Sequence, residues 1–488
     1  MSANSRLGLD FEGGLSLGPA ARIEKATRKK LDSTWENFFG KRRVDWAGMF
    51  LSAASPDGQG QRSPAVKATL APRKDKHGLV VSDSRRLSPW RVIMLARSAT
   101  ELLGTDLVAT LATPSKLADI SWIQPGISAW DAWWTGVNPS QPKFQGVAAR
   151  GDTRSHEEYI EFASEMGWRY QLIDWHWYEP MNTPAADLTK PTADVDIPAL
   201  VAYARARGVR LFLWVHSDDL SRQGVAKVLA HIADWGFAGV KIDFMNSDSQ
   251  ETVRWYVDVL EEAARRHLLV DFHGAYKPTG LARTWPNYIT QEGVLGNEYN
   301  KLPGNKCTPQ HQITLPFTRG LLGPMDFTPG GFVNRTIADF RITSPAQVMG
   351  TRARQLAMTV VYESPLLVLC DSPANYRSKP GIEFLRGLPT VWDDSVVPSA
   401  EVAKHVVIAR RSGDSWWLAA MNAEEPLTLN VPLNFLGTGA WRLREFADGP
   451  EAAEKPESIA AGVRTVKGGE TIQIKLAPNG GYAGALTR

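Results

Sequence analysis

Cysteine is nearly absent from this 488-residue chain, which has only Cys307 and Cys370. The two are far apart, and neither has a second Cys or His at ligand spacing, so a disulfide framework or a zinc site is not expected. Strong charge of either sign is also missing, because the formal net charge is only +3 and no basic run is interleaved with aromatic residues. Nucleic acid and anionic membranes are therefore poor candidate partners.

Long apolar runs are absent as well. No stretch of 18 apolar residues occurs, and the first residues, MSANSRLGLDFEGG, have neither a basic n-region nor an apolar h-region. We therefore predict no membrane span and no export signal in this chain. No GxGxxG motif follows a predicted strand and no Gly-x-Ser-x-Gly elbow occurs, so the usual nucleotide and serine-hydrolase signatures are missing.

Tryptophan, in contrast, is abundant, with 18 residues. Two groups stand out, Trp130, Trp133 and Trp134 in ISAWDAWWTG, and Trp175 and Trp177 in YQLIDWHWYE. Most indoles in a protein pack in its core, but indoles clustered beside Asp and His also favour a pocket in which sugar rings stack on aromatic planes.

The middle of the chain alternates amphipathic helix patterns with short apolar runs. The predicted helices cover residues 155–167, 197–208, 225–236 and 249–267. Strand candidates are ISAWDAWW, YQLIDWHW, RLFLWVHS, GVKIDF, LLVDFHGA, YITQEGVLG, GPMDF at 323–327 and PLLVLC at 365–370. About eight such units predict a (β/α)8 TIM barrel rather than a doubly wound sheet.

Polar side chains gather at the ends of these strands, which is where a TIM barrel carries its active site. They are Asp174, His216, Asp243, Asp271, His273, Glu292 and Glu298. Each alone would fit a helix cap or a salt bridge. Together, carboxylates, His and Trp are typical of glycoside hydrolysis, which needs two carboxyl groups flanking an anomeric carbon. Asp243 and Glu298 come from different strands, as such a pair should.

Four segments, GFAGVKIDFMNSDSQ, VDFHGAYKPTGLARTWPN, QEGVLGNEYN and HQITLPFTRGLLGPMDFTPGGF, resemble the catalytic barrel of glycoside hydrolase family 97. The resemblance covers roughly residues 119 to 488 and predicts three domains. These are a shortened N-terminal β-sandwich (1–118), the barrel (119–388) and a C-terminal antiparallel β-sandwich (389–488). Short strands of alternating hydrophobicity from HVVIARRSG onward also indicate this C-terminal sandwich.

The resemblance implies a retaining exo-α-glycosidase, with Asp243 as nucleophile and Glu298 as general acid/base. Inverting members of the family carry Glu where Gly274 and His216 stand here. An α-galactosidase is therefore expected, acting on an oligosaccharide or another α-galactoside. An α-glucosidase, or a carbohydrate-binding barrel with weakened catalysis, remains the alternative. The expected substrate-binding residues are Trp133, Asp174, Trp175, His216, Lys241, Asp271 and His273.

Calcium is the implied cofactor, with Glu292 as a ligand. A further family ligand is a Glu from the N-terminal domain, and this chain has Arg42 or Arg43 in its place. Calcium needs several oxygen ligands, which one Glu does not supply. Family members are commonly periplasmic or secreted, and we expect a monomer or a dimer.

Overall fold

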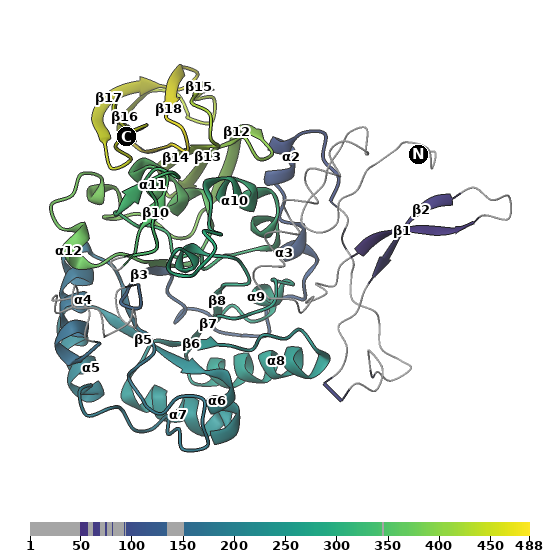
Figure 1. Ribbon diagram of the computed structural model, residues 1–488, viewed down its shortest axis with the longest axis vertical. Helices are drawn as coiled ribbons and strands as arrows, with labels where there is room; N and C mark the ends of the chain where they lie inside the picture. The colour runs from purple at the N-terminus through teal and green to yellow at the C-terminus, as the bar shows by residue number, and fades with distance from the viewer. Residues whose placement is uncertain are drawn as a thin grey trace.

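The computed structural model describes residues 94–133, 151–343 and 346–488, together with the strands β1 (Met49–Pro56) and β2 (Arg62–Ala68) and residues 74, 75, 81 and 92. β1 and β2 form an antiparallel pair (Figure 1). The remainder of the predicted N-terminal sandwich, including Arg42 and Arg43, lies outside the described residues, as does Trp134. Among the helices that are described, none combines the length and the apolar character that crossing a bilayer requires.

A parallel sheet of seven strands occupies the centre of the molecule (Figure 1). Its order is β11 (Leu366–Leu369), β3 (Gly126–Trp130), β4 (Tyr170–Ile173), β5 (Arg210–His216), β6 (Gly239–Asp243), β7 (Leu269–Phe272) and β8 (Tyr288–Gln291). The last strand in sequence pairs with the first, so the sheet curls around toward closure. The predicted TIM barrel is confirmed.

Helices lie between the strands and cover the outside of the sheet. The main ones are α4 (Thr153–Met166), α5 (Ile197–Ala206), α6 (Ser217–Gln223), α7 (Val225–Trp235) and α8 (Gln250–Arg265). Their ends follow the sequence closely. Asp152 and Ser249 accept N-terminal amide hydrogens of α4 and α8, and Gly167 and Gly236 end α4 and α7 in the left-handed conformation.

The inside of the barrel has two levels. Apolar side chains such as Tyr170, Leu172, Phe212 and Leu269 fill one part of it. Buried polar side chains, among them Lys241 and Asp243, lie at the carboxyl ends of the strands. Because successive strand residues alternate between the two faces, these two side chains share the inner face of β6.

The seventh predicted strand, 323–327, is not a strand of the sheet, and this prediction was wrong. Gly323 has a φ of 131°, and Pro324 has no amide hydrogen to donate to a ladder. The segment still bridges the gap, since Met325 N donates to Glu363 O and Asp326 N to Gln291 O.

The buried guanidinium of Arg319 completes this closure. It donates to the carbonyl oxygens of Gln291, Glu292, Gly293, Gly323 and Pro324. Burial lowers its pKa to about 9. Side-chain donors thus take the place of a strand ladder between β8 and the bridging segment.

Shorter elements form the loops around the barrel. They are α2 (Ala99–Leu103), α3 (Leu107–Leu111), α9 (Leu281–Thr284), η2 (Asn297–Lys301), α10 (Pro309–Thr314), η3 (Leu315–Phe317), η4 (Arg319–Leu322), β9 (Asn334–Arg335), β10 (Val348–Met349), α12 (Pro373–Tyr376) and η5 (Ile382–Phe384). Of these, η2 is part of the site described below.

The C-terminal region is the predicted antiparallel sandwich (Figure 1). One sheet has the order β12 (Asp394–Glu401), β13 (His405–Ser412), β14 (Ser415–Asn422), β19 (Gly481–Thr487), β16 (Ala440–Asp448), β17 (Ile459–Lys467), and the other pairs β15 (Leu427–Pro432) with β18 (Thr471–Leu476).

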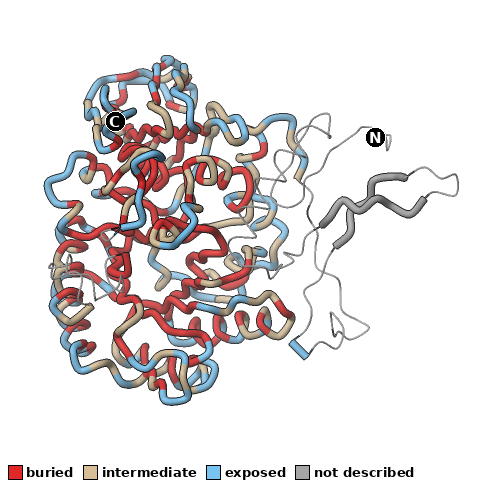
Figure 2. Tube along the Cα trace, in the orientation of Figure 1, coloured by how far each residue is buried: buried red, intermediate tan, exposed pale blue. Residues whose placement is uncertain are grey.

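The sandwich packs against the barrel through α11 (Arg352–Val361), all ten residues of which are buried. Figure 2 shows the buried core continuing from the barrel into this region. Within α11, Arg354 donates to Pro309 O and Gln312 Oε1 on the barrel side and to Asn422 O in β14. Packing against the barrel, as predicted, is therefore one role of this domain.

Candidate active site

Two carboxylates, Asp174 after β4 and Asp243 at the end of β6, are held in the same way. In each, Oδ1 accepts the amide hydrogen of the next residue, at 3.0 Å from Trp175 and 2.6 Å from Phe244. In each, Oδ2 also accepts an indole hydrogen from the preceding strand of the sheet. The sequence thus builds two similar acid sites at one end of the barrel.

The pKa values of the two aspartates shift in opposite directions, because Asp174 pairs with Lys241 and Asp243 does not. The Nζ atom of Lys241, a side chain that is 1% exposed, donates to Asp174 Oδ2 at 2.9 Å. Burial alone would raise the pKa of Asp174, but the Lys241 ammonium holds it below its ordinary value. Asp174 is therefore an anion held in place by three protein donors, and its Oδ1, which accepts from Trp175 N, can accept a further hydrogen bond.

Asp243 has a weaker set of partners. The indole Nε1 of Trp214 in β5 donates to its Oδ2 at 3.1 Å, and His273 Nδ1 lies 3.8 Å from the same oxygen. Burial raises its pKa, against the opposing charges of His273 and Lys241. None of the lysines in the described part of the chain makes a direct ion pair with it, so Asp243 is the more available of the two carboxylates for attack on a substrate.

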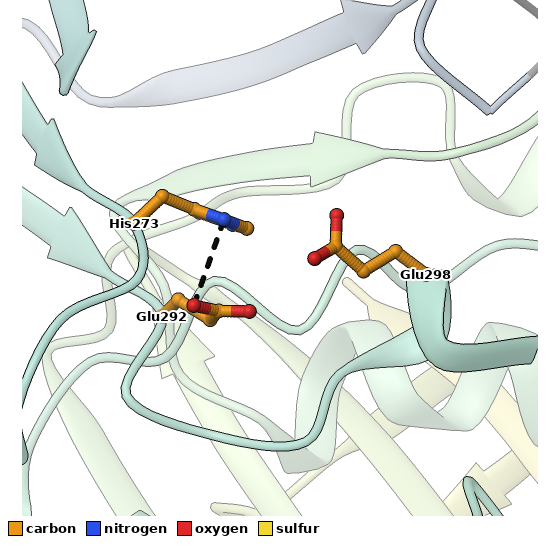
Figure 3. A group of neighbouring side chains, drawn as sticks. All are labelled: His273, Glu292 and Glu298. Atoms are coloured by element: carbon orange, nitrogen blue, oxygen red, sulfur yellow. Dashed lines mark ion pairs between the residues drawn. The ribbon is translucent and has the colours of Figure 1, made fainter. Parts of the chain in front are cut away.

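His273 connects the acids at the mouth of the barrel (Figure 3). Its Nδ1 lies 3.6 Å from Glu292 Oε2. Although burial lowers the pKa of His273, the charges of Glu292 and Glu298 raise it well above the ordinary value. The imidazole is therefore a cation among carboxylates.

Glu292 follows β8 and accepts the amide hydrogen of Gly274 at 2.8 Å. Burial, with the charges of Glu298 and Asp243, raises its pKa to about 8. One ligand atom each from His273, Glu292 and Glu298 lie within 4.8 Å of one another. Figure 3 shows the Glu298 carboxylate directed toward the other two side chains.

Glu298 is carried by the turn η2 and is only partly buried. Three residues later on that turn, Lys301 donates to Ala132 O and lies over the rings of Trp130 and Trp133. Burial lowers the pKa of Lys301. This arrangement ties η2 to the end of β3, which is three places from β6 in the order of the sheet.

Asp271 does not lie at the mouth of the site, and its contact with sugar stays a prediction. It is 1% exposed and lies on β7, two residues before His273 and thus one level deeper in the barrel. Burial and the neighbouring carboxyl group of Asp326 raise its pKa well above the ordinary value. Asp326 Oδ2 lies 3.3 Å from His273 Nε2. Asp326 therefore contacts the imidazole on the side opposite Nδ1, and Asp271 lies next to Asp326.

The predicted tryptophan residues also differ in how far they are buried. Trp133 is fully buried in the interior cluster, whereas Trp175 is partly exposed with its ring 3.9 Å from that of His176. Trp177 is fully buried and packs edge-on against Trp235 in the helical layer, away from the barrel interior. Among the predicted indoles that the structure describes, Trp175 is thus the one whose exposure permits contact with a ligand.

His216 ends β5 and is buried. Its Nδ1 accepts the amide hydrogen of Asp218, which caps α6. In the neutral ring the proton is then on Nε2, which makes that atom a donor. Nε2 is therefore the atom through which His216 would bind substrate, as the sequence predicted.

Sequence reasoning missed three residues of the site. They are Trp214, whose indole holds Asp243, Lys301 at the end of η2, and Asp326 behind His273. Trp130, one of the clustered indoles expected at a sugar pocket, donates to Asp174. Strand alternation was the available signal for Trp214, because it lies two residues before His216 on β5. Asp326 gave no such signal, since its segment is not a strand.

Three family models match the chain. Glycosyl-hydrolase 97 N-terminal matches residues 42–114, Glycoside hydrolase 97 residues 133–294, and Glycosyl-hydrolase 97 C-terminal, oligomerisation, residues 391–487. The chain belongs to glycoside hydrolase family 97. It is a glycoside hydrolase, as the sequence predicted.

Two curated relatives agree with this family 97 assignment. The chain is 32% identical over 454 residues to a retaining alpha-galactosidase of Bacteroides thetaiotaomicron, covering 90% of this chain and 67% of that protein. It is 36% identical over 409 residues to a probable retaining alpha-galactosidase of Streptomyces bingchenggensis, covering 83% and 59%. The chain therefore spans about two thirds or less of these relatives.

Solved structures show the same family 97 architecture. A glycoside hydrolase family 97 enzyme from Pseudoalteromonas sp. strain K8, in complex with acarbose, aligns with a TM-score of 0.77 at 28% identity, over 91% of this chain and 71% of that chain. A beta-arabinopyranosidase aligns with a TM-score of 0.64 at 27% identity, over 79% and 59%.

Proposed function

We propose that this family 97 glycoside hydrolase is a retaining exo-acting α-galactosidase with Asp243 as nucleophile. The observation that carries the proposal is the environment of Gly274. A β-carbon added there would lie 2.7 Å from Phe244 N and 3.0 Å from Asp243 Oδ1. A carboxylate base at position 274 and the observed Asp243 therefore exclude each other, which favours direct attack by Asp243.

The chemistry is a double displacement. Asp243 attacks the anomeric carbon while Glu298 donates a proton to the leaving oxygen, which gives a covalent glycosyl-enzyme. Glu298 then takes a proton from water, which attacks the same carbon and releases the sugar with its original configuration. Retention of this kind requires the two carboxyl groups to lie about 5 to 5.5 Å apart.

The floor of the site provides the contacts for the terminal sugar. Asp174 and Lys241 form a buried ion pair at 2.9 Å, and Lys241 lies over the Trp130 ring. Sugar hydroxyls accept from an ammonium group and donate to a carboxylate, so this pair can recognise a polyol ring from both sides. Galactose is proposed because both curated relatives carry the name alpha-galactosidase.

A calcium ion is proposed beside the general acid. Glu292 and Glu298 offer carboxylate oxygens, the ligand type that calcium prefers. The raised pKa of Glu292, to about 8, reflects burial and crowding of negative charge that a cation would relieve. When bound, the ion would neutralise this charge and bind sugar oxygens.

The product's anomeric configuration tests the proposed function. Wild-type protein is mixed with p-nitrophenyl α-galactoside, and the sugar released first is followed by proton NMR before mutarotation. We expect the α-anomer first. Appearance of the β-anomer would overturn the assignment of Asp243, and cleavage of only the α-glucoside would overturn the choice of sugar.

Self-association is proposed for the C-terminal sandwich, which matches a family model described as an oligomerisation domain. We propose a dimer. Light scattering behind size-exclusion chromatography should give about twice the chain mass of 53.8 kDa. A mass of one chain at micromolar concentration would contradict this.

A further inference from the structure

Phe244 follows the proposed nucleophile directly and is 50% exposed. Among the exposed large hydrophobic side chains that the structure describes, it is the only aromatic one. Large aromatic side chains are normally buried, because they have the most to gain from leaving water. An exposed ring beside a catalytic carboxylate therefore calls for a functional explanation.

The backbone of Phe244 is held in a costly conformation. Its φ is 67°, in the left-handed region that bulky side chains avoid. Such strain is unfavourable and persists only where the surroundings enforce it. Here the Phe244 amide donates to Asp243 Oδ1 at 2.6 Å, and Gly274 leaves room for the turn because it has no side chain.

The ring of Phe244 is oriented by two aromatic neighbours. It stacks on the His216 imidazole, with centroids 5.2 Å apart and planes at 26°. It also meets the Trp214 indole edge-on, with centroids 6.2 Å apart. The indole that holds Asp243 therefore also holds Phe244. The exposed ring has a defined position beside the nucleophile.

The burial of the site floor determines the direction in which the substrate leaves the site. The floor of the site, formed by Trp130, Asp174 and Lys241, is buried, so a substrate cannot extend past these side chains. The anomeric carbon of that sugar must lie at Asp243. The rest of the substrate then extends away from the floor toward solvent, on the side where Phe244 is exposed.

We propose that Phe244 and His216 form a stacking platform for the leaving group, a pyranose or aryl ring attached to the reacting sugar. The exposed face of the Phe244 ring contacts the apolar face of that ring, and His216 Nε2 donates to one of its hydroxyl groups. The inference rests on the proposed function, because a leaving-group subsite presupposes attack at Asp243.

Leaving groups with and without a ring separate this role from an effect on the nucleophile. We would compare kcat/KM for p-nitrophenyl α-galactoside, for a galactosyl-α-1,6-glucose disaccharide and for α-galactosyl fluoride, whose leaving group has no ring. The kcat/KM for the fluoride reports any effect of a substitution on Asp243 itself. The ratio of each ring substrate to the fluoride therefore measures the platform.

In Phe244→Ala both ratios should fall roughly 3- to 10-fold, the size expected for one aromatic contact. Phe244→Tyr keeps the ring and should keep the ratios within about twofold. The control is Val463→Ala, which removes an exposed apolar side chain from β17 in the C-terminal sandwich. It should leave both ratios at the wild-type value.

Unchanged ratios in Phe244→Ala would overturn the platform. A loss that is equal for all three substrates would also overturn it, because Phe244 would then act only by holding Asp243. If wild-type protein cleaves all three substrates, the proposed function stands whatever the variants do. A wild type that cleaves none of them refutes the proposed function and this inference together.

Discussion

His273 Nδ1 lies 3.8 Å from Asp243 Oδ2 and 3.6 Å from Glu292 Oε2, so one imidazole lies between two acidic side chains from β6 and β8, the strands on either side of β7. Asp243, the proposed nucleophile, is thereby kept near a cation, and none of the described lysines makes a direct ion pair with it. Removing a carboxylate from this group changes the charge of the whole site, which makes its role measurable.

Replacing the nucleophile gives the most direct prediction. Asp243→Gly should lower kcat by about 10⁴-fold or more, because no other group can form the glycosyl-enzyme. Azide should restore part of the activity and give a β-galactosyl azide, with inverted configuration. Asp258→Ala, an exposed aspartate on α8, is the control and should retain full activity. Near wild-type turnover in Asp243→Gly would refute the assignment.

Glu298→Gln should discriminate between leaving groups. A disaccharide needs a proton on its departing oxygen, whereas p-nitrophenolate leaves without one. We expect kcat/KM to fall about 10²- to 10⁴-fold for the disaccharide and much less for the aryl galactoside. The measurement is a pair of steady-state assays. Equal losses would mean that Glu298 has a structural role.

Stability should depend on pH through Glu292. Its pKa is about 8 in the folded protein against an ordinary value of 4.5. Between these values the folded state keeps a proton that the unfolded state releases, so the free energy of unfolding falls as pH rises. Without calcium, Tm should drop by about 2 to 6 °C between pH 5 and pH 8.

Two comparisons separate the causes of this drop. Glu292→Gln cannot ionise and should flatten the pH dependence. Added calcium, which binds the carboxylate form, should raise Tm most at pH 8. If calcium leaves Tm unchanged at pH 8, the proposed metal site is wrong. An equal slope in Glu292→Gln would instead place the titration on another group.

Gly274→Ala tests how closely the nucleophile is packed. The added methyl group would lie 2.7 Å from Phe244 N, 2.9 Å from its Cα and 3.0 Å from Asp243 Oδ1. We expect kcat/KM to fall about 10- to 100-fold, since small displacements of a catalytic group are costly.

Gly413→Ala is a matched control for this variant. Gly413 has a φ of 58° against 55° for Gly274, and an added β-carbon there would meet nothing within 4 Å. It therefore carries the same backbone strain without the clash. Equal activity in the two variants would show that packing at Gly274 does not position Asp243.

The sequence predicts the strands and helices of the barrel well, because hydrophobic periodicity and glycine stops have local causes. For example, the helix predicted over 225–236 is α7, Val225–Trp235. Prediction failed where the structure depends on distant partners. Closure by the Arg319 side chain has no local signature, and the segment 323–327 fills the place of a strand although Gly323 and Pro324 prevent strand pairing.

The candidate site shows the same limit. Strand ends placed Asp174, Asp243 and His273 correctly at one end of the barrel, because parallel strands share a direction. The depth of each side chain inside the barrel was harder to infer. Asp271 lies on the same inner face as His273 but one level lower, and a period of two residues does not reveal which level a ligand reaches.

The position of α11 has a consequence for how the protein unfolds and how it can be divided. This helix is buried on every side, between the barrel and the C-terminal sandwich, and Arg354 donates to backbone carbonyls of both. Removing the strands from β12 onward would expose its apolar residues and leave a buried guanidinium without its partner at Asn422. Barrel and sandwich should therefore melt in one cooperative transition, and the sandwich cannot be exchanged between family members as an independent module.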